Sequence, residues 1–217
     1  MVVRILTRRD LLRAGLAGAA FAASPLVPLP SAQSMSPVPS ASATEMPDTL
    51  SSAESQILEA IVARLIPTDS NGAGAAEAQV ARYIDRALGG ALVSSRSAYA
   101  AGLAAVGLYA HKSKGESFAR LAVVDQDSIL ADMENNVATG FSPDSSTFFE
   151  LLLSHTMQGM FGDPYYGGNA NFVGWDLLGY PGVRIMVTAN QQRMGIELAP
   201  NHKSAYDYDL FTKAAPR

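Results

Sequence analysis

Apolar residues recur at helical spacing in several stretches of the chain after residue 50. The first stretch places five aliphatic side chains on one helical face: Ile57, Leu58, Ile61, Val62 and Leu65. Ser51 and Glu54 precede this face at the spacing of a capping box, and Pro67 follows it. The pattern predicts a helix that begins near Ser51 and ends before Pro67.

Similar patterns predict four further helices, over about residues 77–88, 94–113, 127–135 and 143–160. The last of these is the most hydrophobic, so we expect it to be the central, buried helix, with Pro143 in its first turn. Neither an internal repeat nor a β-α-β alternation is visible in the sequence. The predicted fold class is therefore all-α, an irregular helical bundle.

The stretch from Phe161 to Gly182 departs from this pattern, because glycine, proline, asparagine and aromatic residues replace the helical spacing. Six of its residues are glycines, and Asp163-Pro164 and Tyr180-Pro181-Gly182 are turn signals. Its six aromatic side chains argue against disorder. We expect a long, ordered loop near the C-terminus without regular secondary structure.

Three roles are open for the aromatic side chains of this loop: covering the end of the bundle, anchoring a protein interface, or stacking on a sugar ring. Ten residues are candidates for a partner interface: Phe161, Pro164, Tyr165, Tyr166, Gly167, Gly168, Asn169, Trp175, Tyr180 and Pro181. Beyond the loop, residues 183–186 suit a short strand or an extended segment. The polar tail 201–217 carries three aromatic residues and is suited to wrap over the body or over a partner.

The first 34 residues have the architecture of a signal peptide, with a basic opening, a short apolar run and then Ser, Pro and Ala residues. Thr7 to Arg13 resembles a twin-arginine export motif, with Arg8 and Arg9 as the arginine pair and Leu11 and Leu12 as the hydrophobic pair. Cleavage after residue 34 or after residue 43 fits equally well. We therefore expect a signal peptide over 1–34, a flexible Ser/Pro/Ala linker over 35–49 and a single helical domain over 50–217.

The charge and the cysteine count exclude several classes of function. The formal net charge is −4 at pH 7, and loss of the four arginines and one acid of residues 1–34 makes the mature chain more acidic. This balance argues against nucleic-acid binding and against a polybasic membrane anchor. The chain has no cysteine, which excludes disulfides, thiolate nucleophiles, thiolate metal sites and covalent haem attachment through this chain.

The histidines and the glycine-rich motifs do not form a recognisable catalytic or cofactor site. His111, His155 and His202 lack any H-E-x-x-H spacing, and we expect His155 to be a hydrogen-bonded core or interface residue on the central helix. No serine lies in a G-x-S-x-G elbow. Gly167-Gly168-Asn169 lacks the spacing and the preceding strand of a dinucleotide loop, so a loop-shaping role is favoured.

One group of oxygen-bearing residues suits a hard cation by composition: Asp69, Asn71, Glu77 and Asp85. Because these residues do not follow the EF-hand register, a solvated loop is the preferred interpretation. We therefore predict no catalytic, cofactor-binding or metal-binding residue in this chain.

Several motifs together are similar to one known family. They are the signal motif of residues 7–13, the sequences Leu65-Ile66-Pro67-Thr68-Asp69, Gly72-Ala73-Gly74-Ala75 and Tyr83-Ile84-Asp85, and above all the block from Gly162 to Asn169 with Gly174-Trp175 and Gly179 to Gly182. In these the chain resembles the gluconate 2-dehydrogenase subunit 3 family, over about residues 50–185. The glycine and aromatic block is the specific part of the likeness.

The resemblance implies a small, or gamma, subunit of an exported, acceptor-dependent dehydrogenase that oxidises gluconate or a similar sugar or sugar acid. The implied partners are a large catalytic subunit that holds FAD, a cytochrome c subunit with haem c, and the twin-arginine export machinery. The small subunit would escort the flavoprotein to the periplasm and stabilise it there, peripheral to the inner membrane and in contact with it only through the complex. The alternative is a free-standing periplasmic carbohydrate-binding or stress protein.

Overall fold

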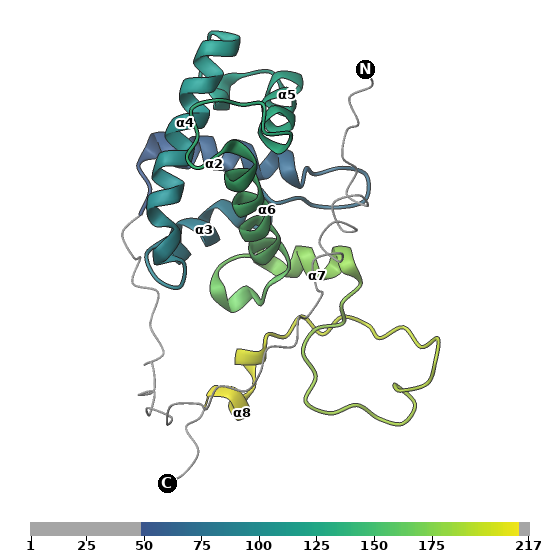
Figure 1. Cartoon of the computed structure of the whole chain (residues 1–217). Coiled ribbons are helices and arrows are strands. Elements are labelled where there is room, and N and C mark those ends of the chain that lie inside the picture. Colours follow the sequence, from purple (N-terminus) through teal and green to yellow (C-terminus); the bar gives the residue numbers. More distant parts are fainter. Residues whose placement is uncertain (1–48, 213–217) are drawn as a thin grey trace, which may run out of the picture. The chain divides into compact units, whose positions relative to one another are not determined.

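The computed structural model describes residues 49–212, and within them every regular element is helical (Figure 1). The α-helices are α2 Ser52–Leu65, α3 Val80–Leu88, α4 Arg96–Lys114, α5 Val123–Glu134, α6 Ser145–Phe161, α7 Val173–Leu178 and α8 Asp209–Thr212. Five short 3-10 helices connect them: η1 Val93–Ser95, η2 Phe118–Arg120, η3 Pro164–Tyr166, η4 Ala170–Phe172 and η5 Ala205–Asp207. The all-α prediction is confirmed. The export motif with Arg8, Arg9, Leu11 and Leu12, and the linker apart from Thr49, lie outside the described residues.

Helix α2 begins and ends where the sequence pattern predicts. The Ser51 backbone N–H donates to Glu54 Oε2 at 2.8 Å, and the Ser51 side chain accepts from the Glu54 backbone N–H, so the capping box is complete. Leu58, Ile61 and Val62 are fully buried along one face.

Several predicted helix starts differ from the structure by a few residues, and three of them have local reasons. Helix α3 begins at Val80 instead of residue 77, because Gln79 adopts a left-handed conformation with φ of 54°. Helix α5 begins at Val123 instead of residue 127, so its first turn includes the apolar residues Val123 and Val124. Pro143 precedes helix α6, whose N-cap is Asp144, because the Asp144 carboxylate accepts the Thr147 N–H at 2.8 Å.

Helix α6 is the central helix, as its breadth of apolar surface predicts, and it packs against α2, α3, α4, α5 and α7 (Figure 1). Its Leu152 and Met160 side chains are fully buried. Glycines on the packed surfaces permit close approach: a Cβ at Gly102 of α4 would collide with the Phe148 ring of α6. Gly159 and Met160 near the C-terminal end of α6 are also buried, and this end supports the segment that follows.

After α7 the chain leaves the bundle in a long loop and returns through η5 to α8 (Figure 1). Residues 183–186 belong to no strand, and Ile185 lies in a bend, so the short-strand alternative is wrong. No single helix within residues 49–212 is long and apolar enough to cross a membrane; α3 together with Val93–Lys114 meets that criterion only as a pair bent by 92°.

Candidate functional site

The segment from Phe161 to Gly182 is not an irregular loop, because it contains the short helices η3, η4 and α7. Asp163 starts η3: its side chain accepts the Tyr165 N–H at 2.9 Å, and Pro164 occupies the first helical position. Gly167 ends η3 with a φ of 96°, a conformation that glycine adopts without strain. The prediction of a loop without regular secondary structure was therefore wrong: Asp163 caps η3, and η4 and α7 follow it without a side-chain cap.

Asn169 is fully buried and connects α6, the turn that follows it and the start of α7. Its side-chain Nδ2 donates to the Gly162 carbonyl at 2.9 Å, and its Oδ1 accepts the Gly174 N–H at 2.8 Å. Its backbone N–H donates to the Gly159 carbonyl at 2.7 Å. Asn169 thus holds the start of α7 and the turn after α6 in one hydrogen-bonded arrangement.

Two glycines allow the segment to lie directly on the end of α6. A Cβ at Gly168 would collide with the Gly159 carbonyl, and a Cβ at Gly174 would collide with the Met160 carbonyl. Both glycines are buried. This close packing confirms the predicted loop-shaping role for Gly168, and Gly174 plays the same part at the start of α7.

Trp175 packs locally. Only 6% of its surface is exposed, and its indole N–H donates to the Phe161 carbonyl at 2.9 Å. Its ring lies against those of Phe172 and Tyr180, with centroid distances of 5.4 and 4.8 Å. Trp175 therefore closes the core at the end of the bundle.

The other candidate interface residues differ in exposure. Tyr165 and Tyr166 are 55% and 53% exposed, and Tyr180 is 40% exposed. Gly168 and Asn169 are buried, and four residues are half-buried: Phe161, Pro164, Gly167 and Pro181. The structure thus brings the ten residues into one segment but leaves mainly the tyrosines available for contact from outside.

Tyr206 of the C-terminal tail lies against the exposed Tyr165 and Tyr166, and it was not among the predicted interface residues. Its ring stacks on that of Tyr165 with a centroid distance of 3.6 Å, and its hydroxyl lies 2.7 Å from the Tyr166 hydroxyl. The hydrogen bond with Tyr166, then burial, then the nearby Asp163 charge raise the pKa of Tyr206. The only signal for Tyr206 in the sequence was the aromatic content of the tail. Of the two predicted alternatives, body or partner, the tail wraps over the body.

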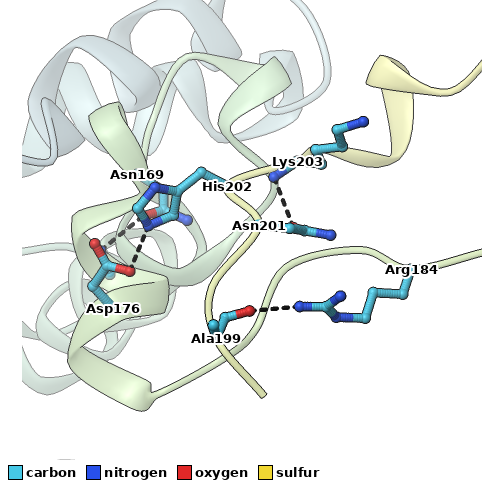
Figure 2. Close-up of polar contacts among 8 residues, drawn as sticks. Asn169, Asp176, Arg184, Ala199, Asn201, His202 and Lys203 are labelled. Atoms are coloured by element: carbon cyan, nitrogen blue, oxygen red, sulfur yellow. Dashed lines mark hydrogen bonds and ion pairs between the residues drawn. The ribbon is translucent and has the colours of Figure 1, made fainter. Parts of the chain in front are cut away.

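A second contact of the tail lies at α7, where His202 Nε2 is 2.8 Å from Asp176 Oδ1 (Figure 2). The His202 ring also stacks on Phe172, with a centroid distance of 5.0 Å. Nearby, the Arg184 side chain donates to the Ala199 carbonyl (Figure 2). These contacts close the base of the long loop formed by residues 184–200.

His155 is a hydrogen-bonded core residue, which confirms the sequence interpretation. Its Nδ1 lies 3.0 Å from the Tyr99 hydroxyl, and the two rings stack inside the bundle. Burial lowers the pKa of His155 and raises the pKa of Tyr99, because the charged form of each is poorly solvated there. The pair contributes to the core and lies apart from the exposed tyrosines Tyr165 and Tyr166.

The oxygen-bearing residues noted in the sequence serve separate local contacts. Glu77 accepts hydrogen bonds from the Thr68 hydroxyl and the Gly74 N–H, whereas Asp85 accepts the Thr49 and Leu50 N–H groups. In the part of the chain that the structure describes, no three His, Asp or Glu side chains gather where a metal ion could be held.

Comparison with known protein families identifies a matching family model. The model of the family described as gluconate 2-dehydrogenase subunit 3 matches residues 52–182, which include α2 to α7 and the whole glycine and aromatic segment. Searches of curated proteins and of solved structures found no significant match.

Proposed function

Because the chain belongs to the gluconate 2-dehydrogenase subunit 3 family, we propose that it is the non-catalytic small subunit of a periplasmic FAD-dependent dehydrogenase. Family membership supports a subunit of a multi-subunit dehydrogenase complex. The finer proposal is that the complex oxidises gluconate or a similar sugar or sugar acid. A large subunit binds FAD and the substrate, and a cytochrome c subunit accepts the electrons.

One structural observation carries the proposal: two tyrosines stand about half exposed on a segment that is otherwise rigidly held. Asp163 and Pro164 fix the turn that presents Tyr165 and Tyr166, and Gly168 and Asn169 attach the segment to α6. Ordered tyrosines are enriched in protein interfaces, because they provide apolar area and a polar hydroxyl at small entropic cost. The tyrosine surface, defined as Tyr165 and Tyr166 with Tyr206 stacked beside them, is therefore the proposed docking site for the large subunit.

The twin-arginine motif gives the small subunit a second role in this proposal. The large subunit folds around FAD and leaves the cytoplasm bound to the small subunit, whose Arg8 and Arg9 are read by the export machinery. A chain without cysteine suits this route, because its fold depends on its helical core and not on oxidation after export.

The test is co-purification of the untagged full-length chain with an affinity-tagged, FAD-dependent large subunit encoded in the same genome. We expect the small subunit to elute with the flavoprotein from the periplasmic fraction. Tyr165→Ala with Tyr166→Ala should abolish this co-elution, since truncation of an interface hot spot costs about 2 kcal/mol or more per residue. Leu108→Ala is the matched control, because Leu108 is 73% exposed on α4.

Recovery of the wild-type chain only as a free protein would overturn the proposal. Saturable quenching of Trp175 fluorescence by sugars in that free protein would instead favour the carbohydrate-binding alternative.

A further inference from the structure

The tail residues 201–208 lie outside the segment that the family model matches, yet they contact both that segment and Val183, the residue that follows it. The Asn201 N–H donates to the Pro181 carbonyl at 3.1 Å, and the Val183 N–H donates to the Lys203 carbonyl at 3.0 Å. The Tyr208 hydroxyl donates to the Val183 carbonyl at 2.7 Å. Together with the His202 contact to α7, these bonds fix the path of the tail before and after Tyr206.

Asp163 links the tail to the tyrosine surface directly. Its Oδ1 accepts the Ser204 hydroxyl at 2.6 Å and its Oδ2 accepts the Ala205 N–H at 3.0 Å. Oδ1 also accepts the Tyr165 N–H that starts η3. One carboxylate therefore holds both the turn that presents Tyr165 and the turn that presents Tyr206. The two turns are thereby fixed relative to each other.

Tyr206 shapes the surface without covering it. Tyr165 and Tyr166 keep more than half of their surface exposed although Tyr206 stacks on the first and hydrogen-bonds to the second. A segment that occluded the docking site would bury these rings. The contacts thus favour a tail that completes the surface over one that blocks it.

We infer that residues 201–208 form a C-terminal clasp that sets the geometry of the tyrosine surface and adds Tyr206 to it as a contact residue for the large subunit. The inference rests on the proposed function. It assigns part of the docking site to a segment beyond the family match, and it gives that segment a positioning role through the bonds to Asp163 and through the stack of Tyr206 on Tyr165.

The chemistry of the tyrosine surface specifies what the large subunit must offer. In the hydroxyl pair of Tyr166 and Tyr206 one hydroxyl donates to the other, so the accepting hydroxyl keeps its own proton for an outside acceptor. The rings require apolar contact area around that acceptor. Leu210 and Phe211 of α8, four and five residues after Tyr206, are 70% and 54% exposed and add apolar surface to the tail. The matching patch is therefore apolar, with one carboxylate or carbonyl oxygen.

Two substitutions separate positioning from contact. Tyr206→Ala removes the stack and the hydroxyl pair, whereas Tyr206→Phe keeps the stack and removes only the hydroxyl. Met194→Ala is the control, because Met194 is fully exposed on the loop of residues 184–200. Each full-length variant is measured for affinity to the immobilised large subunit and, as the free chain, for hydrogen exchange at the amides of residues 165–167.

We expect Tyr206→Ala to weaken binding by about 30-fold or more, as for a hot spot, and to speed amide exchange in η3. Tyr206→Phe should weaken binding by about fivefold, the effect of one lost hydrogen bond, and leave exchange unchanged. Met194→Ala should change neither.

The outcomes distinguish this inference from the proposed function. If the wild-type chain binds the large subunit and Tyr206→Ala binds equally well, the clasp is overturned and the proposed function stands. Tighter binding by Tyr206→Ala would show an occluding tail and would also overturn the clasp. If the wild-type chain does not bind, the proposed function fails, and unchanged exchange in Tyr206→Ala would also remove the positioning role of the Tyr206 stack.

Discussion

Asn169 shows how much one buried side chain can determine. Its amide donates to the Gly162 carbonyl and accepts the Gly174 N–H, and none of its surface is exposed. Asn169→Asp keeps the shape but replaces the donor by a second acceptor, which leaves the Gly162 carbonyl unpaired and buries a charge. We expect a loss of about 2–4 kcal/mol in the free energy of unfolding, measured by urea denaturation.

Asn171→Asp is the matched control for this substitution. Asn171 shares the left-handed backbone conformation, with φ of 55°, but its side chain is exposed. Its free energy of unfolding should change by less than about 0.5 kcal/mol. Equal effects of the two substitutions would show that charge, and not the buried hydrogen bonds, determines the result.

His155 makes stability depend on pH. Burial lowers its pKa in the folded protein, so the unfolded chain binds a proton more readily. The free energy of unfolding contributed by this residue is therefore fully present above about pH 6.5, the ordinary pKa of histidine, and falls as the pH decreases below it. Thermal unfolding between pH 7.5 and 5.5 should show a larger drop in Tm for the wild-type chain than for His155→Asn, whose amide can still pair with Tyr99. Parallel curves for the two proteins would contradict this assignment.

Single residues were predictable from the sequence where their surroundings are local or strongly apolar. His155 lies among leucines and methionines on the most hydrophobic helix, and this was enough to predict a core role. The contacts of Asp163 with Ala205 and of Tyr165 with Tyr206 could not be predicted in this way, because the two segments are about forty residues apart and meet only in the folded chain.

The helices were predictable for a similar reason. Helix α2 depends on its own capping box and apolar face, so its bounds follow from the sequence. The start of α3 depends on the turn from Gly74 to Gln79, where the Ala75 N–H donates to the Ile66 carbonyl across the preceding loop. The short helices after α6 were missed because glycine and proline indicate breaks in the pattern, although a capping residue such as Asp163 can start a single turn.

The junction between α6 and α7 can be tested through Gly174. Its position allows no Cβ, because the Met160 carbonyl already fills that space, so Gly174→Ala must push α7 away from α6. Overpacking of this kind costs about 1–3 kcal/mol, which corresponds to a drop in Tm of roughly 2–10 °C for a domain of this size. Calorimetry of the purified chain measures the drop.

Gly90→Ala controls for the general effect of replacing glycine. No atom lies within 4 Å of a Cβ at Gly90, and its backbone is not left-handed. Gly90→Ala should therefore leave Tm unchanged or raise it slightly. A comparable drop in both variants would mean that the close packing of α7 on α6 contributes nothing to stability.

At the scale of the whole molecule, the proposed activities fall on two parts of the chain. The helical body and its clasp present the tyrosine surface, whereas the export motif lies at the N-terminus, outside the described residues. If one chain performs both roles, export of the flavoprotein must depend on the small subunit's signal and on the tyrosine surface independently. A substitution in the export motif and a substitution in the tyrosine surface should each move the dehydrogenase activity out of the periplasmic fraction.

Arg8→Lys with Arg9→Lys tests this dependence, because it keeps the positive charge and removes only the arginine pair that the export machinery reads. We expect dehydrogenase activity, assayed with an artificial electron acceptor, to move from the periplasmic to the cytoplasmic fraction, with the two subunits still bound to each other. Arg4→Lys is the control, since Arg4 lies outside the motif, and it should leave the activity periplasmic. Normal periplasmic activity of the Arg8→Lys, Arg9→Lys variant would show that the large subunit reaches the periplasm without this signal, and the escort role would be lost while the docking role could still hold.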